Sequence, residues 1–209
     1  MLESNRWRHY IAPLDPIPSG YAQRGKPKSK VRCLVFDIYG TLFISGSGDI
    51  GTTKKASVDW IALEKMLERH QVGHSARELL DSFYQNIEAE HGSMKRKGID
   101  YPEVDVIHIW RNVLGSWQPD NLHHFALEFE LIVNPVFPMP HLAELLAACR
   151  HANIKMGLIS NAQFYTPILF EIFFDLDVVA LGFDPELTVF SYQIGRAKPS
   201  VMLYDLMGE

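Results

Sequence analysis

The sequence predicts an α/β fold with a parallel sheet, because two short apolar runs are separated by segments with helical periodicity. The first run, 31–36, ends at Asp37, and the second, 154–159, ends at Ser160. Their length and apolar content favour buried strands over helices. Strands that alternate with helices are typical of a parallel sheet, in which functional residues gather at the carboxyl ends of the strands. Asp37 and Ser160 are both expected at such ends.

An extended arm is expected at residues 1–30, where prolines and glycines recur and a basic tail follows. Such a composition favours a surface segment without regular structure. Tyr10, Ile11 and Leu14 could attach this arm to the body of the protein. The first strand follows at 31–36.

A glycine-rich connector at 45–51 is expected to act as a hinge before a group of helices. Apolar residues then recur at helical spacing, and Ser75 and Glu78 form a capping-box pattern that opens a helix. No convincing strand interrupts this part of the sequence. The helices are expected near 60–67, 75–87, 103–114 and 121–132.

The remainder of the chain returns to alternating helices and strands. A helix is expected at 141–151, before the strand at 154–159, and another at 166–174. The apolar run 178–181 is interpreted as a third strand. Lys198 and Pro199 are expected to open a final helix.

The composition is that of a globular protein, with 47% hydrophobic and 22% charged residues and a formal net charge of −5. Without a basic face, nucleic-acid binding is not expected. No stretch is long and apolar enough for a membrane span, and no signal-peptide pattern is present. Cys33 and Cys149 are interpreted as buried, reduced thiols, so a cytoplasmic location is expected.

Asp37 is the strongest candidate for chemistry. It follows a strand and precedes Tyr39, Gly40 and Thr41. A carboxylate at a strand end, beside a glycine that allows a sharp turn, can be presented to a substrate as a nucleophile. The alternative is that Asp37 only caps the turn that follows it.

Three motifs resemble those of the haloacid dehalogenase (HAD) superfamily. The run 35–43 resembles the first, in which a strand ends in an aspartate followed by x-x-Gly-Thr-Leu. The run 158–161 resembles the second, a strand that ends in Ser or Thr, and 197–199 resembles the third, a lysine that opens a helix. The order and the approximate spacing match, and the helical segment lies where the family has a helical cap. The resemblance extends from Val31 to the end of the chain.

This resemblance implies a Rossmann-like core formed by 31–48 and 139–209, with a four-helix cap at 49–138. Asp37 would attack the substrate and form a covalent ester or acyl phosphate. Thr41, Ser160 and Asn161 would bind the substrate's anionic group or the nucleophile. Lys198 would offset the charge of Asp37, since a nearby cation favours an ionised carboxylate. The alternatives are that 160–161 form a helix cap and that Lys198 is a solvated residue.

Tyr39 departs from the family's phosphatases, which have a second aspartate at this position as general acid and base. A phenol is a poor acid near neutral pH. The tyrosine is instead similar to 2-haloacid dehalogenases, in which a halide leaves without a proton. A dehalogenase would need no cofactor. A phosphatase would need Mg²⁺, bound by Asp37 and by the backbone carbonyl of Tyr39. Alternatively, Tyr39 only packs against the cap.

The acidic fourth motif of the family is not found, because Asp205 and Glu209 fall within the expected last helix. The chain is therefore expected to be a fragment or a short relative. The strand at 31–36 would then lie at an edge of the sheet with unpaired backbone groups, and association of two copies through that edge is possible.

Arg111 is the candidate for binding the substrate, because it lies at the edge of an apolar stripe on the third expected helix, although most such cations are only solvated. The sequence thus predicts a hydrolase that uses Asp37 on a small anionic organic substrate, with chemistry of the 2-haloacid dehalogenase type. The alternatives are a Mg²⁺-dependent phosphomonoester phosphatase and an inactive HAD-like binding module.

Overall fold

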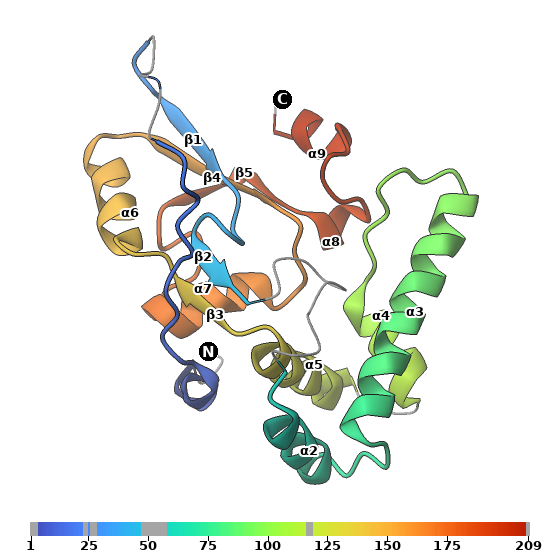
Figure 1. The fold of residues 1–209 in the computed structure, drawn as a ribbon. Helices are drawn as coiled ribbons and strands as arrows, with labels where there is room; N and C mark the ends of the chain where they lie inside the picture. Colours follow the sequence, from blue (N-terminus) through green and yellow to red (C-terminus); the bar gives the residue numbers. More distant parts are fainter. Residues whose placement is uncertain (1–3, 23–24, 26–28, 47–57, 116–118, 208–209) are drawn as a thin grey trace.

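The fold is α/β, built on a parallel sheet whose strand order is β1-β4-β5 (Figure 1). The computed structural model describes residues 4–22, 25, 29–46, 58–115 and 119–207. The strands are β1 (Cys33–Phe36), β4 (Lys155–Ser160) and β5 (Phe183–Phe190). Both pairings are parallel, so the prediction of a parallel sheet is confirmed.

Strand β4 lies in the middle of the sheet and is buried from Met156 to Ser160. Gly157 makes its close approach to β5 possible, because a Cβ added there would lie 2.3 Å from the carbonyl oxygen of Leu187. The register shifts between Met156 and Leu158 at this point. A larger residue would separate the two strands that position Ser160.

Strand β1 is less buried than we expected. Its residues alternate between exposed and partly buried, Val35 is 44% exposed, and the thiol of Cys33 is exposed instead of buried. The reason is that β4 is the only strand paired with β1 among the described residues. Cys149 is buried, as predicted.

The third strand is not at 178–181, where we expected it. These residues form a turn in which the Asp177 side chain accepts a hydrogen bond from the backbone N–H of Ala180. Gly182 has a φ of 100°, and β5 begins at the next residue. Leu181 is buried although it is not in a strand. The apolar run therefore forms a turn that buries Leu181 and leaves Val179 55% exposed.

The four helices expected in the middle of the chain are confirmed. Side chains cap the first three at Asp59, Ser75 and Asp105, and at Ser75 the predicted capping box with Glu78 forms. Aromatic rings pack between them, with Phe83 stacked on Trp110. The helices are α2 (Trp60–Arg69), α3 (Ala76–Arg96), α4 (Val106–Leu114) and α5 (Pro119–Val133).

A two-stranded antiparallel ribbon that the sequence did not predict connects this helical group to the sheet. Strand β2 (Phe43–Ser45) pairs with β3 (Val136–Pro138). The segment that leads from the sheet to the helical group therefore lies beside the segment that leads back. Most of the expected hinge at 45–51 lies outside the described residues. The division of the chain into a core (31–48 and 139–209) and a helical cap (49–138) stays a prediction.

The helices α6 (Leu142–His151) and α7 (Thr166–Phe174) confirm two further predictions. After β5, the short helix α8 (Ser191–Ile194) leads to a turn, and α9 (Met202–Asp205) begins only at Met202. Lys198 does not open a helix, because it lies in a turn where Ser200 N–H bonds to the Ala197 carbonyl. No described helix combines the length and apolar character that a bilayer crossing requires.

We expected an extended N-terminal arm. The arm is instead partly helical. Helix α1 (Ser4–Trp7) continues into a 3₁₀ turn, η1 (Arg8–Tyr10). Trp7 is 2% exposed, and Arg8 donates hydrogen bonds to the Ile172 carbonyl and to Asp175 at α7. The buried indole explains why this segment is held against the helices.

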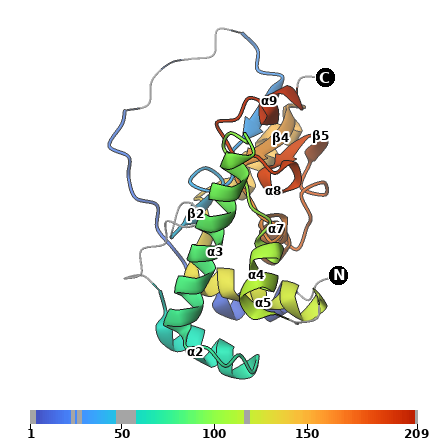
Figure 2. The same ribbon diagram turned by 90° about the vertical axis from the view of Figure 1, so that its right-hand side faces the viewer.

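Helix α3 extends from the region of α2 to the level of α8 and α9, as the two views show (Figures 1 and 2). Its last turn leads into 97–105, which runs back along the turn after α8. There the N–H of Glu103 bonds to the Gly195 carbonyl, and the N–H of Ala197 bonds to the Tyr101 carbonyl. The helical group thus contacts the core beside Lys198.

Candidate active site

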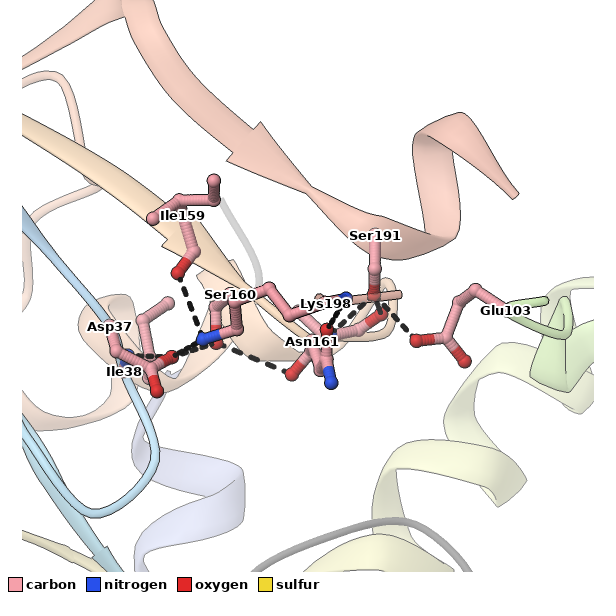
Figure 3. A network of polar contacts seen from close by, with 9 residues as sticks. Asp37, Ile38, Glu103, Ile159, Ser160, Asn161, Ser191 and Lys198 are labelled. Carbon is pink, nitrogen blue, oxygen red and sulfur yellow. Dashed lines mark hydrogen bonds and ion pairs between the residues drawn. The ribbon is translucent and has the colours of Figure 1, made fainter. Parts of the chain in front are cut away.

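Asp37 and Ser160 follow adjacent parallel strands, and the sheet therefore brings them to the same edge. Asp37 comes directly after β1, Ser160 is the last residue of β4, and Phe36 pairs with Leu158. Lys198 reaches this edge from the turn between α8 and α9, so its ammonium group lies between the two strand ends (Figure 3). Three motifs that are distant in the sequence thus meet at one point.

One oxygen of Asp37 is bound by three donors. Asp37 Oδ1 accepts hydrogen bonds from the Ile38 N–H at 2.8 Å and from Ser160 Oγ at 2.9 Å, and it lies 2.7 Å from Lys198 Nζ. Asp37 Oδ2 has no hydrogen-bond or ion-pair partner within the part of the chain that the structure describes. The Asp37 side chain is 40% exposed and that of Lys198 21%. The carboxylate is therefore held at one oxygen and accessible at the other.

Asn161 positions Lys198 and does not contact Asp37 directly. Its side-chain oxygen accepts a 2.7 Å hydrogen bond from the Lys198 backbone N–H, while Lys198 Nζ also donates to the Ile159 carbonyl at 3.3 Å. The hydroxyl of Ser160 has one proton, and its 2.9 Å contact with Asp37 is shorter than its 3.3 Å contact with the Asn161 carbonyl. We infer that Ser160 donates to Asp37.

Tyr39 points into the protein core, with its hydroxyl 2.9 Å from Thr166 Oγ1 on α7. Burial raises the pKa of this phenol far above its ordinary value, and the neighbouring Glu130 raises it further. The phenol is therefore a poor acid near neutral pH.

Thr41 and Arg111 are not brought into contact with Asp37. Thr41 is exposed in the turn after Gly40, whose φ of 79° allows the chain to reverse, and its own N–H donates to the Ile38 carbonyl. Arg111 is exposed near the end of α4 and is not among the residues that line the adjoining cleft. Their predicted roles stay predictions.

A cleft of about 750 Å³ adjoins Lys198, between the end of α3 with the segment after it and the strand-end residues. We call it the active cleft because Lys198, which pairs with Asp37, lines it, although Asp37 and Ser160 are not among its lining residues. Helical periodicity did not predict which helical residues face it. Its polar lining includes His91, Lys95, Asp100, Tyr101, Glu103, Asn161 and Lys198.

Behind the active cleft, a buried carboxylate connects the helical group to the core. Glu103 is 8% exposed and accepts hydrogen bonds from Ser191 Oγ at 2.6 Å and Gln163 Nε2 at 3.1 Å (Figure 3 shows the first). Gln163 also accepts from the Val106 N–H at 3.1 Å, at the start of α4. An acid within the apolar run 101–107 was the available signal, and the sequence interpretation missed it.

The described residues do not form a magnesium site. They contain no cluster of three or more His, Cys, Asp or Glu side chains that could hold a metal ion. At the strand ends, Asp37 is the carboxylate present, and its Oδ1 is bound to an ammonium group. Mg²⁺ prefers several oxygen ligands in octahedral geometry. The described donor set does not fit that preference, and no step here requires the ion.

No family model and no curated protein sequence matches this chain. Similar solved structures include an L-2-haloacid dehalogenase from Xanthobacter autotrophicus with chloropropionic acid covalently bound, at 19% identity and a TM-score of 0.42, covering 85% of this chain and 63% of that one. A dehalogenase matches at 17% identity and a TM-score of 0.40, covering 84% and 69%.

A haloacid dehalogenase-like hydrolase from Bacteroides fragilis matches at 17% identity and a TM-score of 0.38, covering 85% of this chain and 71% of that one. The chain thus spans 63% of the length of the Xanthobacter enzyme. At such identities and TM-scores, these similarities carry no argument about function.

Proposed function

We propose that the protein is a hydrolase in which Asp37 forms a covalent intermediate with a small anionic organic substrate, by chemistry of the 2-haloacid dehalogenase type. The observation that carries this proposal is the asymmetry of Asp37. Its Oδ1 is bound by Ile38, Ser160 and Lys198, while Oδ2 has no partner among the described residues. A carboxylate fixed in this way has one oriented, nucleophilic oxygen.

In the first step, Asp37 Oδ2 attacks the substrate carbon that carries the halogen. The new C–O bond forms as the carbon–halogen bond breaks, and the halide leaves with the bonding electrons. In the second step, water adds to the carbonyl carbon of the ester. The ester bond then breaks, which releases a 2-hydroxy acid and one proton and restores the Asp37 carboxylate.

The contacts of Oδ1 assist both steps. In the ester, Oδ1 is the carbonyl oxygen, and it gains negative charge when water adds. Ser160 Oγ, Lys198 Nζ and the Ile38 N–H already point at this oxygen, so they stabilise the charge without reorganisation. A fixed group of donors of this kind lowers the barrier to hydrolysis.

Lys95 is the proposed partner of the substrate's carboxylate. Lys198 is already paired with Asp37, which leaves Lys95 as the other lysine that lines the active cleft among the described residues. It lies in the last turn of α3, one helical turn after His91, and lines the active cleft together with Asn161 and Lys198. A cation at that position would orient a short 2-halo acid, a role that the sequence had assigned to Arg111.

The position of Tyr39 favours halide over phosphate as the leaving group. A phosphomonoester needs a proton on its leaving oxygen, whereas a halide does not. Tyr39 is bound to Thr166 and its raised pKa makes it a poor acid, so this chain has no proton donor at that position. The phosphatase and the non-catalytic binding module remain the alternatives that the assay below distinguishes.

The test is an assay of the purified chain with 2-chloropropionate and, separately, with a phosphomonoester panel with and without Mg²⁺. The proposal predicts chloride release that Asp37→Asn abolishes, without dependence on Mg²⁺. Magnesium-dependent phosphate release would establish the phosphatase. If neither product appears across short 2-halo acids and phosphomonoesters, catalysis is rejected in favour of a binding module.

A further inference from the structure

A second polar hollow lies away from the active cleft, where the N-terminal helix meets the helical group. It has a volume of about 410 Å³ and shares no lining residue with the active cleft. Helix α1 contributes one of its residues, and the others come from the end of α2 and from α5. We call it the basic hollow, and its lining residues are Arg6, Arg69, His70, Gln71, Asn121 and His124.

The basic hollow contains two guanidinium groups, and an adjoining hollow of about 420 Å³ that shares Arg6, Arg69 and His70 with it is lined by the carboxylate of Glu128. Arg6 is exposed and lies over the Trp7 ring, with its Cζ 5.3 Å from the ring centroid. Arg69 approaches from the end of α2, and its side chain is 53% exposed. With the carboxylate of Glu128 counted, the two arginines leave one net positive charge at the basic hollow, before any protonation of the two histidines.

A buried acid beside the basic hollow orients Arg69 and offsets one of the two positive charges. Glu128 is 5% exposed, and it accepts hydrogen bonds from Tyr10 Oη, from Arg69 Nη2 and from His70 Nε2. Both of its oxygens are therefore used within the protein. Among the described residues the hydrogen bonds of Arg69 use Nη2, and its side chain is 53% exposed.

We propose that the basic hollow binds a phosphate group carried by a small molecule. Arginine guanidinium groups recognise phosphate oxygens through paired N–H donors, and two of them converge here from separate elements. The amides of Gln71 and Asn121 and the ring of His124 add neutral donors around the same space. The volume exceeds that of an inorganic phosphate ion, so it accommodates a phosphorylated metabolite.

Binding at this site would also tie the N-terminal helix to the helical group. Arg6 belongs to α1, whereas Arg69 belongs to α2, and a phosphate between them would contact both. Trp7 already anchors α1, with its ring 5.9 Å from that of His124. This inference does not depend on the proposed hydrolase activity.

The test follows inorganic phosphate, titrated into the full chain at constant ionic strength, by the NMR signals of histidine rings. His124 reports on the basic hollow, and His91 reports on the active cleft. The proposal predicts a saturable shift of the His124 signals. Arg6→Gln should weaken this binding about tenfold, the loss expected for one charged hydrogen-bonding partner. Asn121→Asp should weaken it further, because it adds a negative charge.

The matched control is Arg77→Gln, which removes an arginine that stacks on Trp60 outside the basic hollow. It should bind phosphate as the unchanged chain does. The proposal is overturned if the His124 signals do not shift, if chloride shifts them equally, or if Arg6→Gln binds no more weakly than Arg77→Gln. A shift confined to His91 would place the phosphate in the active cleft and would also overturn it.

Discussion

Two carboxylates in this protein are each paired with cations, but they are available for chemistry to different degrees. Asp37 pairs with Lys198 at the end of β1, and its side chain is 40% exposed. Glu128 pairs with Arg69 and His70 on the helical group, and its side chain is 7% exposed. The exposure decides which of them a substrate could reach.

The two carboxylates also differ in how many of their oxygens accept hydrogen bonds. At Asp37 the described donors bind Oδ1 alone, whereas at Glu128 they bind both Oε1 and Oε2. A carboxylate that accepts hydrogen bonds at both oxygens stabilises the fold, and one that is fixed at a single oxygen can act as a nucleophile. An ion pair alone therefore does not identify a catalytic acid.

Asp37→Asn should produce the largest effect on activity. Loss of a covalent nucleophile is expected to lower kcat by about three orders of magnitude or more. Stability should change by less than about 1 kcal/mol, because the pair with Lys198 is partly exposed. Halide release and thermal unfolding, measured on the same preparation, check both expectations. Substantial remaining turnover would refute the assignment of Asp37.

Glu128→Gln should show the opposite pattern, with activity maintained and stability lost. Removing one partner of a buried charge network is expected to cost about 3 kcal/mol. Denaturant unfolding measures this loss, and Glu88→Gln, at an exposed position of α3, is the control. Equal stability of the two variants would contradict a structural role for Glu128.

Glu128 should also make the stability of the protein depend on pH. Burial alone would raise the pKa of Glu128, but hydrogen bonds from His70, Tyr10 and Arg69 lower it from 4.5 to about 2. A group whose pKa is lower in the folded state stabilises the protein above its unfolded pKa. This contribution should be present above pH 4.5 and lost as the pH falls towards 2. In Glu128→Gln, the slope of stability against pH in that window should decrease.

Lys198→Met should lower kcat by about a hundredfold, as expected for a lost charge that stabilises the oxyanion during ester hydrolysis. Because hydrolysis should slow more than ester formation, the covalent intermediate should accumulate and be detected by mass spectrometry of the intact protein. Lys155→Met is the control, since Lys155 is exposed and pairs with Asp184. A variant without accumulation and with unchanged kcat would exclude this role.

Tyr39→Phe should have the smallest effect. The hydroxyl contacts Thr166 and not Asp37, so kcat should change by less than about threefold, and stability should fall by about 1 kcal/mol for the lost hydrogen bond. Steady-state kinetics across a pH range test this. A large decrease, with a changed pH profile, would show that the phenol takes part in proton transfer.

The sequence predicted the α/β class and placed Asp37 and Ser160 together, because the ends of adjacent parallel strands meet at one edge of a sheet. The position of Lys198 beside Asp37 was expected only from the resemblance to the HAD motifs. The sequence also predicted the four central helices, whose caps and periodicity are local features. Apart from Lys198, each of these predictions depends on short-range patterns or on a general rule of sheet topology.

The errors arose where tertiary contacts decide the outcome. Strand β5 contains Asp184, Pro185 and Glu186, so its pattern is not apolar, whereas the apolar run 178–181 packs as a turn. Trp7 lies in a segment that seemed unstructured. Glu103 and Lys95 approach the active cleft only because the segment after α3 returns to the core, which periodicity alone could not predict.

The most direct test of the central claim is a multiple-turnover experiment in ¹⁸O-labelled water, followed by mass spectrometry of the peptide that contains Asp37. If Asp37 forms an ester that water opens at its carbonyl carbon, repeated turnover of 2-chloropropionate should place solvent oxygen in the Asp37 carboxylate. Product formed with label only in the hydroxy acid, and none in that peptide, would contradict the account.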